Sequence, residues 1–344
     1  MKIANIMFGR GLGGIEQAFL DYNEALLLAG HEVLAVSHPL AAINPEISGN
    51  LTHETISNRG SWDILSAARL RKLYRQWQPD FLISHGNRAI SLNLLANHQS
   101  IHLGVTHNYH LRRFSRLDGV IAITNNLRDA AINAGVHDNR IHLLPNMVRL
   151  PEHAPSQAIH TPPVIGAMGR LIEKKGFHLL LRAASLLMQR DIEFKLIIGG
   201  TGSLESQLKQ QAQQLGLQSH VTFLGWVGDK RDFFDQIDLF CLPSLHEPFG
   251  IVLLEAMAHN RPVVGFSSEG PREIIQNNEA MLVENGNVEA LAEALAAQLA
   301  HPENLAMMGT AGREFVAENY VLHKVSIQLN SILKTLKPLP AKIG

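Results

Sequence analysis

The sequence is poor in the residues and motifs on which disulfide-bonded and metal-dependent proteins rely. Its 344 residues include one cysteine, which excludes a disulfide framework and a zinc site of paired cysteines. That residue, Cys241, lies in the apolar run 239–242, where we expect a buried thiol. The triplet D-x-D and the motif H-E-x-x-H are both absent. We therefore predict no metal ion and no other cofactor.

Strong net charge and long apolar runs are also missing. The formal net charge is −1, which gives no overall field to attract nucleic acid. No apolar run approaches the ~20 residues that cross a bilayer, and the chain opens on a strand-like run rather than on a signal peptide. We expect a cytoplasmic protein, and peripheral binding to the inner face of the cytoplasmic membrane stays open.

What the chain does contain is an alternation of short apolar runs and amphipathic segments, typical of parallel α/β sheets. We expect strands at 3–8, 33–37, 81–84, 103–106, 120–122, 141–144, 164–168, 194–198, 221–224, 239–242 and 263–266. Helices are expected at 15–29, 62–77, 177–189, 251–258, 287–299, 304–318 and 322–336.

A proline-rich segment divides this alternation into two series. Four prolines fall between residues 149 and 163, which indicates a linker. We predict a Rossmann-like domain at 1–150, a linker at 151–163 and a second Rossmann-like domain at 164–320, with parallel sheets facing an interdomain cleft. For the remaining helical segment, 321–344, packing back on the first domain is one arrangement.

The first strand is followed by a glycine-rich turn. Gly9, Gly11 and Gly14 satisfy G-x-G-x-x-G, but a dinucleotide site also needs an acidic residue at the end of the second strand. That strand ends Val36-Ser37-His38, which disfavours an NAD-dependent dehydrogenase. A close approach of the backbone to some other ligand remains, with a merely tight turn as the alternative.

The segment His246–Glu255 places two carboxylates around the start of a helix. Glu247 precedes a Pro-Phe-Gly turn, and Glu255 lies inside the apolar helix that follows. Free amides at a helix N-terminus favour phosphate, so the pair suits a nucleotide-sugar, with one carboxylate for sugar hydroxyls and one for ribose hydroxyls. A core helix flanked by two solvated acids is the alternative.

Basic and glycine-rich loops follow the first two strands of the second series. Arg170 and Lys175 would supply positive charge to a diphosphate, and the loop 199–202 repeats the glycine pattern. Ligands of open α/β sheets bind outside the carboxyl ends of the strands, where these loops and the Glu247 segment fall. A solvated basic loop is the alternative.

These motifs together resemble glycosyltransferase family 4, which comprises retaining, nucleotide-sugar-dependent enzymes of the GT-B fold. The resemblance spans nearly the whole chain and rests on Gly13-Gly14-Ile15-Glu16, Gly30-His31-Glu32-Val33, Leu144-Pro145-Asn146, Gly169-Arg170…Lys175-Gly176, Gly199-Gly200-Thr201-Gly202, Pro243-Ser244, Glu247–Glu255 and Gly270–Ile275. Met147 departs from the family, in which many members have glycine after Pro-Asn.

The resemblance implies roles at the matching positions. Glu247 would contact donor-sugar hydroxyls, Glu255 the ribose, and Arg170 with Lys175 the diphosphate. The implied donor site comprises Gly13, Gly14, Gly169, Arg170, Lys175, Gly200, Glu247, Phe249, Gly250, Ile251 and Glu255.

The resemblance also identifies His107 as the active-site histidine at the end of a strand, although a packed or surface histidine is the alternative. Its implied catalytic partners are Glu247, Arg170 and Lys175, and the implied acceptor residues are Gly14, His107, Asn108 and His110.

The resulting hypothesis is a metal-independent retaining hexosyltransferase. It would move a sugar from a nucleotide-diphosphate sugar, UDP-sugar favoured, to a glycan or lipid-linked acceptor in bacterial lipopolysaccharide or other envelope polysaccharide synthesis. A GT-B nucleotide-sugar epimerase and a non-catalytic sugar-nucleotide-binding protein are the alternatives.

A basic surface in the first half bears on membrane contact. Residues 1–150 hold 14 Lys and Arg against 11 Asp and Glu. Four of these cations, Arg69, Arg71, Lys72 and Arg75, share the helix 62–77 with Trp62 and Leu65, and Arg112, Arg113 and Arg116 form a second group. Such a helix suits an anionic membrane surface, although an ordinary solvated helix face is the alternative.

Overall fold

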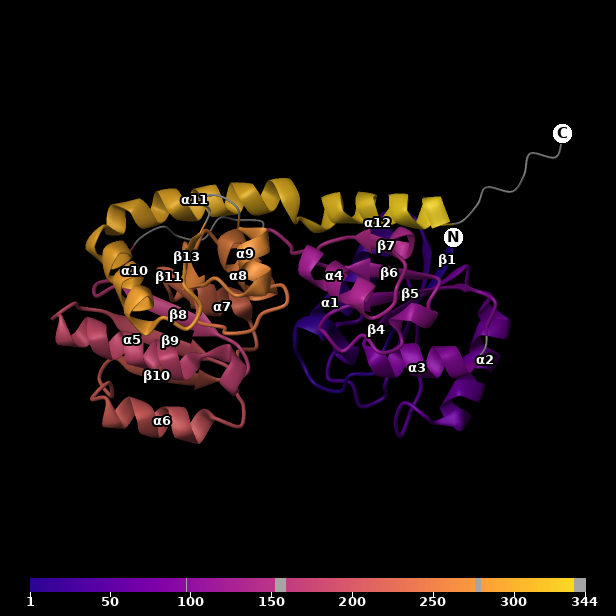
Figure 1. The fold of residues 1–344 in the computed structure, drawn as a ribbon, viewed down its shortest axis with the longest axis horizontal. Coiled ribbons are helices and arrows are strands. Elements are labelled where there is room, and N and C mark those ends of the chain that lie inside the picture. The colour runs from indigo at the N-terminus through magenta and orange to yellow at the C-terminus, as the bar shows by residue number, and fades with distance from the viewer. Residues whose placement is uncertain (97, 152–158, 276–279, 337–344) are drawn as a thin grey trace. The chain divides into compact units, whose positions relative to one another are not determined.

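The computed structural model describes residues 1–344 apart from 97, 152–158, 276–279 and 337–344. The chain forms two compact units (Figure 1). The first comprises Met1–Met147 and the segment that begins at Tyr320, and the second comprises Val148–Asn319. The parts of the predicted linker at 152–158 and of the C-terminal segment at 337–344 lie outside the described residues.

The first unit is built on a seven-stranded sheet in which every strand pairing is parallel. The strand order is β3-β2-β1-β4-β5-β6-β7, so β1 separates the two directions in which the sheet grows. The strands are β1 (Lys2–Met7), β2 (Glu32–Ser37), β3 (Thr52–Thr55), β4 (Phe81–His85), β5 (Ile101–Thr106), β6 (Gly119–Ala122) and β7 (Ile141–Leu143). Loops that follow β1 and β4 therefore meet at the switch point where such sheets bind ligands.

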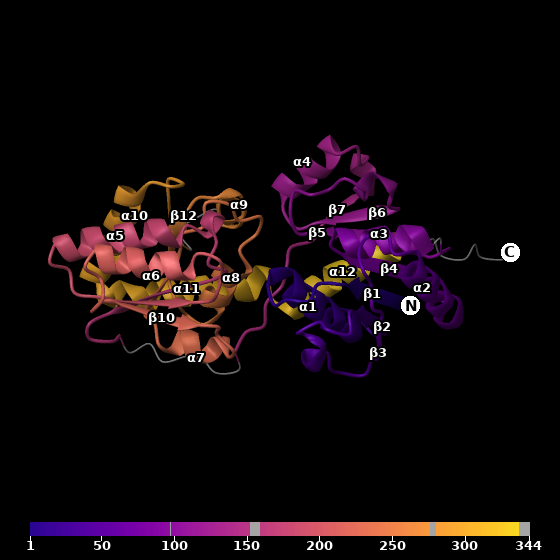
Figure 2. The ribbon, with the colours of Figure 1, turned by 90° about the horizontal axis from the view of Figure 1, so that it is seen from below.

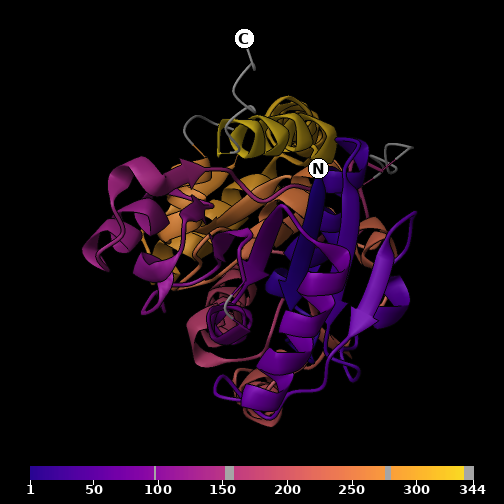
Figure 3. The same cartoon turned by 90° about the vertical axis from the view of Figure 1, so that its right-hand side faces the viewer.

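The helices of this unit come from both ends of the chain. They are α1 (Gly14–Leu28), α2 (Ile64–Trp77), α3 (Asn87–Ala96), α4 (Asn125–Asn133) and α12 (Leu322–Leu336). Helix α12 packs against α1 and lies near the start of β1 (Figures 1 and 3). Its buried apolar residues, Leu322, Val325, Leu329 and Leu333, recur at helical spacing, so α12 buries one apolar stripe against this unit.

The second unit is built on a six-stranded parallel sheet in the order β10-β9-β8-β11-β12-β13. Its strands are β8 (Val164–Met168), β9 (Lys195–Gly199), β10 (Val221–Gly225), β11 (Leu239–Leu242), β12 (Val263–Phe266) and β13 (Met281–Val283). Its helices are α5 (Phe177–Gln189), α6 (Glu205–Gln214), α7 (Lys230–Asp235), α8 (Ile251–Ala258), α9 (Glu269–Ile274), α10 (Val288–Ala300) and α11 (Pro302–Asn319). Helices α5 and α10 lie side by side over one core (Figures 1 and 2).

The predicted fold class of two Rossmann-like parallel sheets is confirmed. Cys241 is buried as expected, and burial raises the pKa of its thiol. The helix predicted at 62–77 instead begins at Ile64, because the Asp63 carboxylate caps it by accepting from the Ser66 N–H at 3.1 Å. No helix within the described ranges combines the length and hydrophobicity needed to cross a bilayer.

Candidate active site

The loops that follow β8, β9 and β11 in the second unit are joined by backbone hydrogen bonds. The Leu245 N–H donates to the Lys174 carbonyl at 3.0 Å, and the Leu171 N–H donates to the Thr201 carbonyl at 2.9 Å. The structure thus confirms that the glycine-rich, basic and carboxylate-bearing loops gather at one edge of the sheet.

Two glycines explain how these loops come so close. Gly176 has a left-handed backbone with φ of 67°, and a Cβ there would stand 1.9 Å from the Pro243 carbonyl oxygen. Gly200 has φ of 122°, and its Cβ would stand 1.9 Å from the Gly169 carbonyl oxygen. Loop packing alone therefore requires glycine at both positions, and donor contact by Gly169 and Gly200 stays a prediction.

The predicted catalytic pair Lys175 and Glu247 is brought together directly. The Lys175 Nζ lies 2.5 Å from the Glu247 Oε2, with the two side chains 19% and 12% exposed. A lysine ammonium carries three N–H donors, so Lys175 can hold this carboxylate and still donate to a ligand oxygen.

Glu269 supports the same loop and was missed at the sequence level. Its carboxylate accepts from the Glu247 N–H at 3.2 Å and contacts the His246 Nδ1 at 3.1 Å. Burial raises the pKa of Glu269, but hydrogen bonds from its own N–H, from His246 and from the Glu247 N–H lower that pKa overall. The available sequence signal was an acidic residue in the first turn of a short helix, where the helix dipole favours negative charge.

Glu255 has a lysine partner that the sequence did not reveal. The Lys230 Nζ, on the first residue of α7, lies 2.5 Å from the Glu255 Oε1. In the sequence Lys230 stands among Asp229, Arg231 and Asp232, a mixture of charges that is typical of solvated surface. Each of the two predicted hydroxyl-binding carboxylates is thus tied to a lysine.

The start of α8 offers backbone donors beside these carboxylates. Gly250 caps the helix with φ of 102°, and its carbonyl accepts from the Leu253 N–H at 2.9 Å. Across the described residues, no acceptor faces the N–H groups of Gly250, Ile251 and Val252. Arg170 is exposed and forms no ion pair with any described residue. These groups match an anion in charge and in hydrogen bonding.

In the first unit, the candidate His107 ends a chain of buried hydrogen bonds. Asn5 Nδ2 donates to the Phe19 carbonyl at 3.0 Å, which orients the amide so that its Oδ1 faces the His85 Nε2 at 2.9 Å. The His85 Nδ1 in turn lies 2.9 Å from the His107 Nε2. His85, which is 2% exposed, was not predicted from the sequence, because nothing in the sequence distinguishes it from other residues of its strand.

This series of hydrogen bonds determines which nitrogen of His107 carries the proton. Burial and the neighbouring His107 hold the pKa of His85 well below its ordinary value, so His85 is neutral. Its Nε2–H donates to Asn5, and its Nδ1 must then accept from the His107 Nε2–H. Burial lowers the pKa of His107 to about 4, so neutral His107 keeps a lone pair on Nδ1 and can accept a hydroxyl proton in a hydrogen bond.

The other acceptor candidates have local contacts. Asn108 Oδ1 accepts from the His110 N–H at 2.9 Å, which makes an Asx-type turn, and the His110 carbonyl accepts from Asn87 Nδ2 at 2.8 Å. Gly13 precedes α1, and the Glu16 carboxylate lies beside the positions where a Cβ of Gly9 or Gly13 would stand. That carboxylate, rather than an open anion site, therefore lies against the glycine turn, and ligand contacts of Gly13, Gly14, Asn108 and His110 stay predictions.

Burial of another histidine leads to a pH-dependent stability. His102 is 2% exposed, and burial, helped by His98, lowers its pKa to about 3 from the ordinary 6.5. Between pH 6.5 and 3, His102 binds a proton in the unfolded chain but not in the folded state. The contribution of His102 to folding stability is therefore full above pH 6.5 and falls as the pH drops toward 3. We expect His102 to contribute a slope of about 1.4 kcal/mol per pH unit. Urea unfolding from pH 7.5 to 4.5 measures it; an unchanged slope in a folded His102→Gln variant would contradict it.

Two protein-family profiles match this chain. A sequence profile of the group 1 glycosyl transferases matches residues 149–315, and a profile of glycosyltransferase family 4 matches residues 12–151. The chain belongs to glycosyltransferase family 4. It is therefore a glycosyltransferase, and the predicted family and enzyme class are confirmed.

Relatives of this glycosyltransferase match it over nearly its full length. The lipopolysaccharide core biosynthesis glycosyltransferase LpsE of Rhizobium meliloti (strain 1021) is 28% identical over 340 residues, covering 93% of this chain and 98% of LpsE. The crystal structure of HepE from Anabaena in complex with UDP and glucose has a TM-score of 0.84 at 21% identity, covering 97% of this chain and 100% of HepE. The apo form of the lipopolysaccharide outer core galactosyltransferase WaaB has a TM-score of 0.74 at 18% identity, covering 97% and 100%. These structures share the GT-B fold with this glycosyltransferase.

Proposed function

We propose that this glycosyltransferase transfers a sugar, with retention, from a UDP-sugar to a glycan or lipid-linked acceptor of the bacterial envelope. The second unit binds the donor, and the first unit binds the acceptor. The observation that carries the proposal is the edge of the second sheet. There the ion pairs Lys175–Glu247 and Lys230–Glu255 lie at the helix α8, whose first N–H groups have no acceptor among the described residues.

The groups at this edge differ in what they can bind. The donor phosphates are negatively charged. Their charge is complemented by the side chains of Arg170 and Lys175 and by the amides of Gly250 and Ile251. Sugar and ribose hydroxyls need acceptors, which the carboxylates of Glu247 and Glu255 provide. Each lysine partner holds its carboxylate in place through an ion pair, so each carboxylate can accept hydroxyl hydrogen bonds without leaving its loop.

The same groups promote departure of the nucleoside diphosphate. Negative charge grows on the leaving phosphate, and preorganised cations and amides stabilise it in the transition state. Glu247 serves as a hydroxyl acceptor rather than a covalent nucleophile, because its charge is engaged by Lys175 at 2.5 Å. Family membership supports retention through a front-side displacement.

The choice of donor and pathway draws support from the relatives. HepE was crystallised with UDP and glucose, and LpsE and WaaB are named for the lipopolysaccharide core. These names favour a UDP-sugar and an envelope glycan for this chain too.

A nucleotide-sugar panel tests the donor. A ligand that binds only the folded state stabilises it by mass action, about 2.7 kcal/mol at 100 times Kd. We expect a UDP-sugar to raise the melting temperature by several degrees, GDP-, ADP- and TDP-sugars to raise it less, and Lys175→Ala to abolish the effect. Equal or absent shifts across the panel would reject the UDP-sugar proposal. Conversion of the donor without acceptor would instead favour the epimerase.

We also propose peripheral contact with an anionic membrane through the start of α2. Trp62, Ile64 and Leu65 are each 75% exposed, and the Arg113 guanidinium stacks over the Trp62 ring at 4.7 Å. Arg69 is exposed on the next helical turn, whereas Arg71 is engaged through its Nε, which donates to the Ala96 carbonyl at 2.6 Å. Exposed apolar tips bordered by cations suit a bilayer surface.

Vesicle flotation measures this contact. We expect the protein to float with phosphatidylglycerol-containing vesicles at low salt. Trp62→Ser with Leu65→Ser should weaken binding about tenfold or more, because each side chain loses apolar burial. Ile327→Ser, which changes a 57% exposed residue on α12, is the matched control. Absence of flotation at low salt would contradict the proposal.

A further inference from the structure

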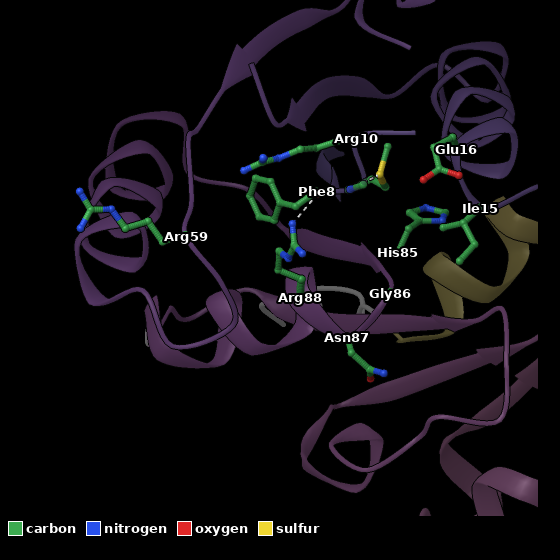
Figure 4. A pocket seen from close by; sticks show the side chains of 11 residues that line it. Phe8, Arg10, Ile15, Glu16, Arg59, His85, Gly86, Asn87 and Arg88 are labelled. Carbon is green, nitrogen blue, oxygen red and sulfur yellow. Dashed lines mark hydrogen bonds between the residues drawn. The ribbon is translucent and has the colours of Figure 1, made fainter. Parts of the chain in front are cut away.

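The first unit contains a pocket that the donor site does not use. It has a volume of about 480 Å³ and lies where β1 and β4 end (Figure 4). Its charged lining residues are Arg10, Arg59, Arg88 and Glu16. Three guanidinium groups against one carboxylate give the pocket a positive charge, and its volume is in the range that holds a sugar-sized ligand.

Among the described residues, no carboxylate pairs with Arg10 or Arg88. In Figure 4 they extend from different segments toward the same side of the pocket, beside Phe8. The Arg88 Nη1 donates to the Phe8 carbonyl at 3.2 Å, and the Arg10 Nη2 reaches the Asn58 carbonyl only at 3.4 Å. Neither arginine forms an ion pair within the described ranges. Each guanidinium has five N–H donors, so most of this donor capacity remains for a ligand.

His38 does not supply the missing acceptor. Its Nδ1 accepts from the Leu40 N–H at 3.0 Å. Burial, followed by the charges of Arg10 and Arg88, lowers the pKa of His38, so the ring is neutral and has a single acceptor nitrogen. Its Nε2 stands 3.0 Å from the Arg10 Nη2, so the ring cannot accept from both Leu40 and Arg10. An anion that accepts from Arg10 would relieve this contact.

The opposite side of the pocket carries a negative charge. Glu16 lies toward Ile15 and His85 in Figure 4, away from the guanidinium groups of Arg10 and Arg88. Its carboxylate can accept hydroxyl hydrogen bonds but repels an anion. A ligand that is anionic at one end and hydroxyl-bearing at the other therefore matches the pocket.

We propose that this pocket binds the acceptor through an anionic group, a phosphate or a carboxylate, held by Arg10 and Arg88. The inference rests on the proposed function, since it assumes that the first unit receives the acceptor, and it narrows the acceptor class to acidic glycans. Sugar hydroxyls of the same ligand lie toward Glu16.

Calorimetric titration of the full chain tests the proposal, with saturating UDP present to occupy the donor site. The probes are glucose 6-phosphate, glucuronate and glucose. We expect one or both anionic sugars to bind and glucose to bind at least tenfold more weakly. Arg10→Gln and Arg88→Gln should each weaken binding of the anionic sugar about tenfold, the effect of a lost charge-assisted contact. Binding of only one anionic sugar identifies phosphate or carboxylate as the recognised group.

Controls separate this inference from the proposed function. Arg170→Gln should weaken UDP binding and leave the anionic sugar unaffected, while Arg10→Gln should do the reverse. Equal binding of glucose, no binding of either anionic sugar, or wild-type affinity in the Arg10→Gln/Arg88→Gln double variant would overturn the pocket assignment even if UDP binds normally. If the wild-type protein did not bind UDP, the donor proposal would be rejected and the pocket assignment would be unaffected.

Discussion

Replacing Lys175 by alanine should lower turnover by ~100-fold or more, the size of effect seen when one preorganised electrostatic contact to a transition state is removed. The Lys175 Nζ lies 2.5 Å from Glu247 and is 19% exposed as a side chain, so its charge acts in a partly desolvated site. Glu247→Ala should have an effect of similar size, because it removes a hydroxyl acceptor and releases the lysine. Release of UDP in the presence of acceptor measures both.

Because Lys175 and Glu247 form one ion pair, their substitutions should not have additive effects on turnover. Two groups that act as a unit lose most of their effect in the first substitution, so the double variant should fall far short of the ~10,000-fold expected if they acted independently. The neighbouring Lys174 is exposed and makes no ion pair with the described residues, so Lys174→Ala is the matched control and should stay within about twofold. A folded Lys175→Ala variant with near-wild-type turnover would refute the phosphate assignment.

Gly176→Ala should destabilise the second unit by about 3 kcal/mol or more and lower its melting temperature by roughly 8 °C. A left-handed backbone costs an alanine about 1–2 kcal/mol, and the new Cβ would stand 1.9 Å from the Pro243 carbonyl oxygen. Either that carbonyl or the loop bearing Lys175 must move, so turnover should fall as well. Calorimetry and activity measurements report the two effects.

Two other glycines separate backbone strain from the clash. Gly225 has φ of 70° with open space around its Cβ position, and Gly228 has open space without a positive φ. Gly225→Ala should therefore cost about 1–2 kcal/mol and Gly228→Ala almost nothing. If Gly176→Ala were no worse than Gly225→Ala, the close approach of Gly176 to Pro243 would not matter to stability.

Regular elements with strong apolar patterns could be predicted from the sequence. Strands β8, β11 and β12 and helices α5, α8 and α12 have the expected bounds, because each is a buried run or an amphipathic stripe that gives way to polar, glycine or proline residues. Strand β3, Thr52–Thr55, was missed because it is an exposed edge strand without apolar alternation. Short helices such as α4 and α7 carry too few apolar residues to show a period.

The candidate site divides in the same way. Lys175, Glu247 and Glu255 became candidates because each belongs to a short local motif beside or within the first turns of a helix. Lys230, Glu269 and His85 were missed because each acts through a partner far away in the chain: 25 residues for Lys230, 22 for Glu269 and 22 for His85. Contacts between residues so far apart in the sequence depend on the order of the strands and on how the loops pack. No local sequence pattern reveals either of these.

The central claim is that the edge of the second sheet binds the nucleotide-sugar donor. Backbone hydrogen exchange of the full chain with and without UDP tests it most directly, since the N–H groups of Gly250, Ile251 and Val252 have no acceptor in the described structure. We expect slower exchange at residues 169–176 and 245–255 when UDP is bound. Slower exchange confined to the glycine turn at residues 9–16, with no change in those two loops, would contradict it.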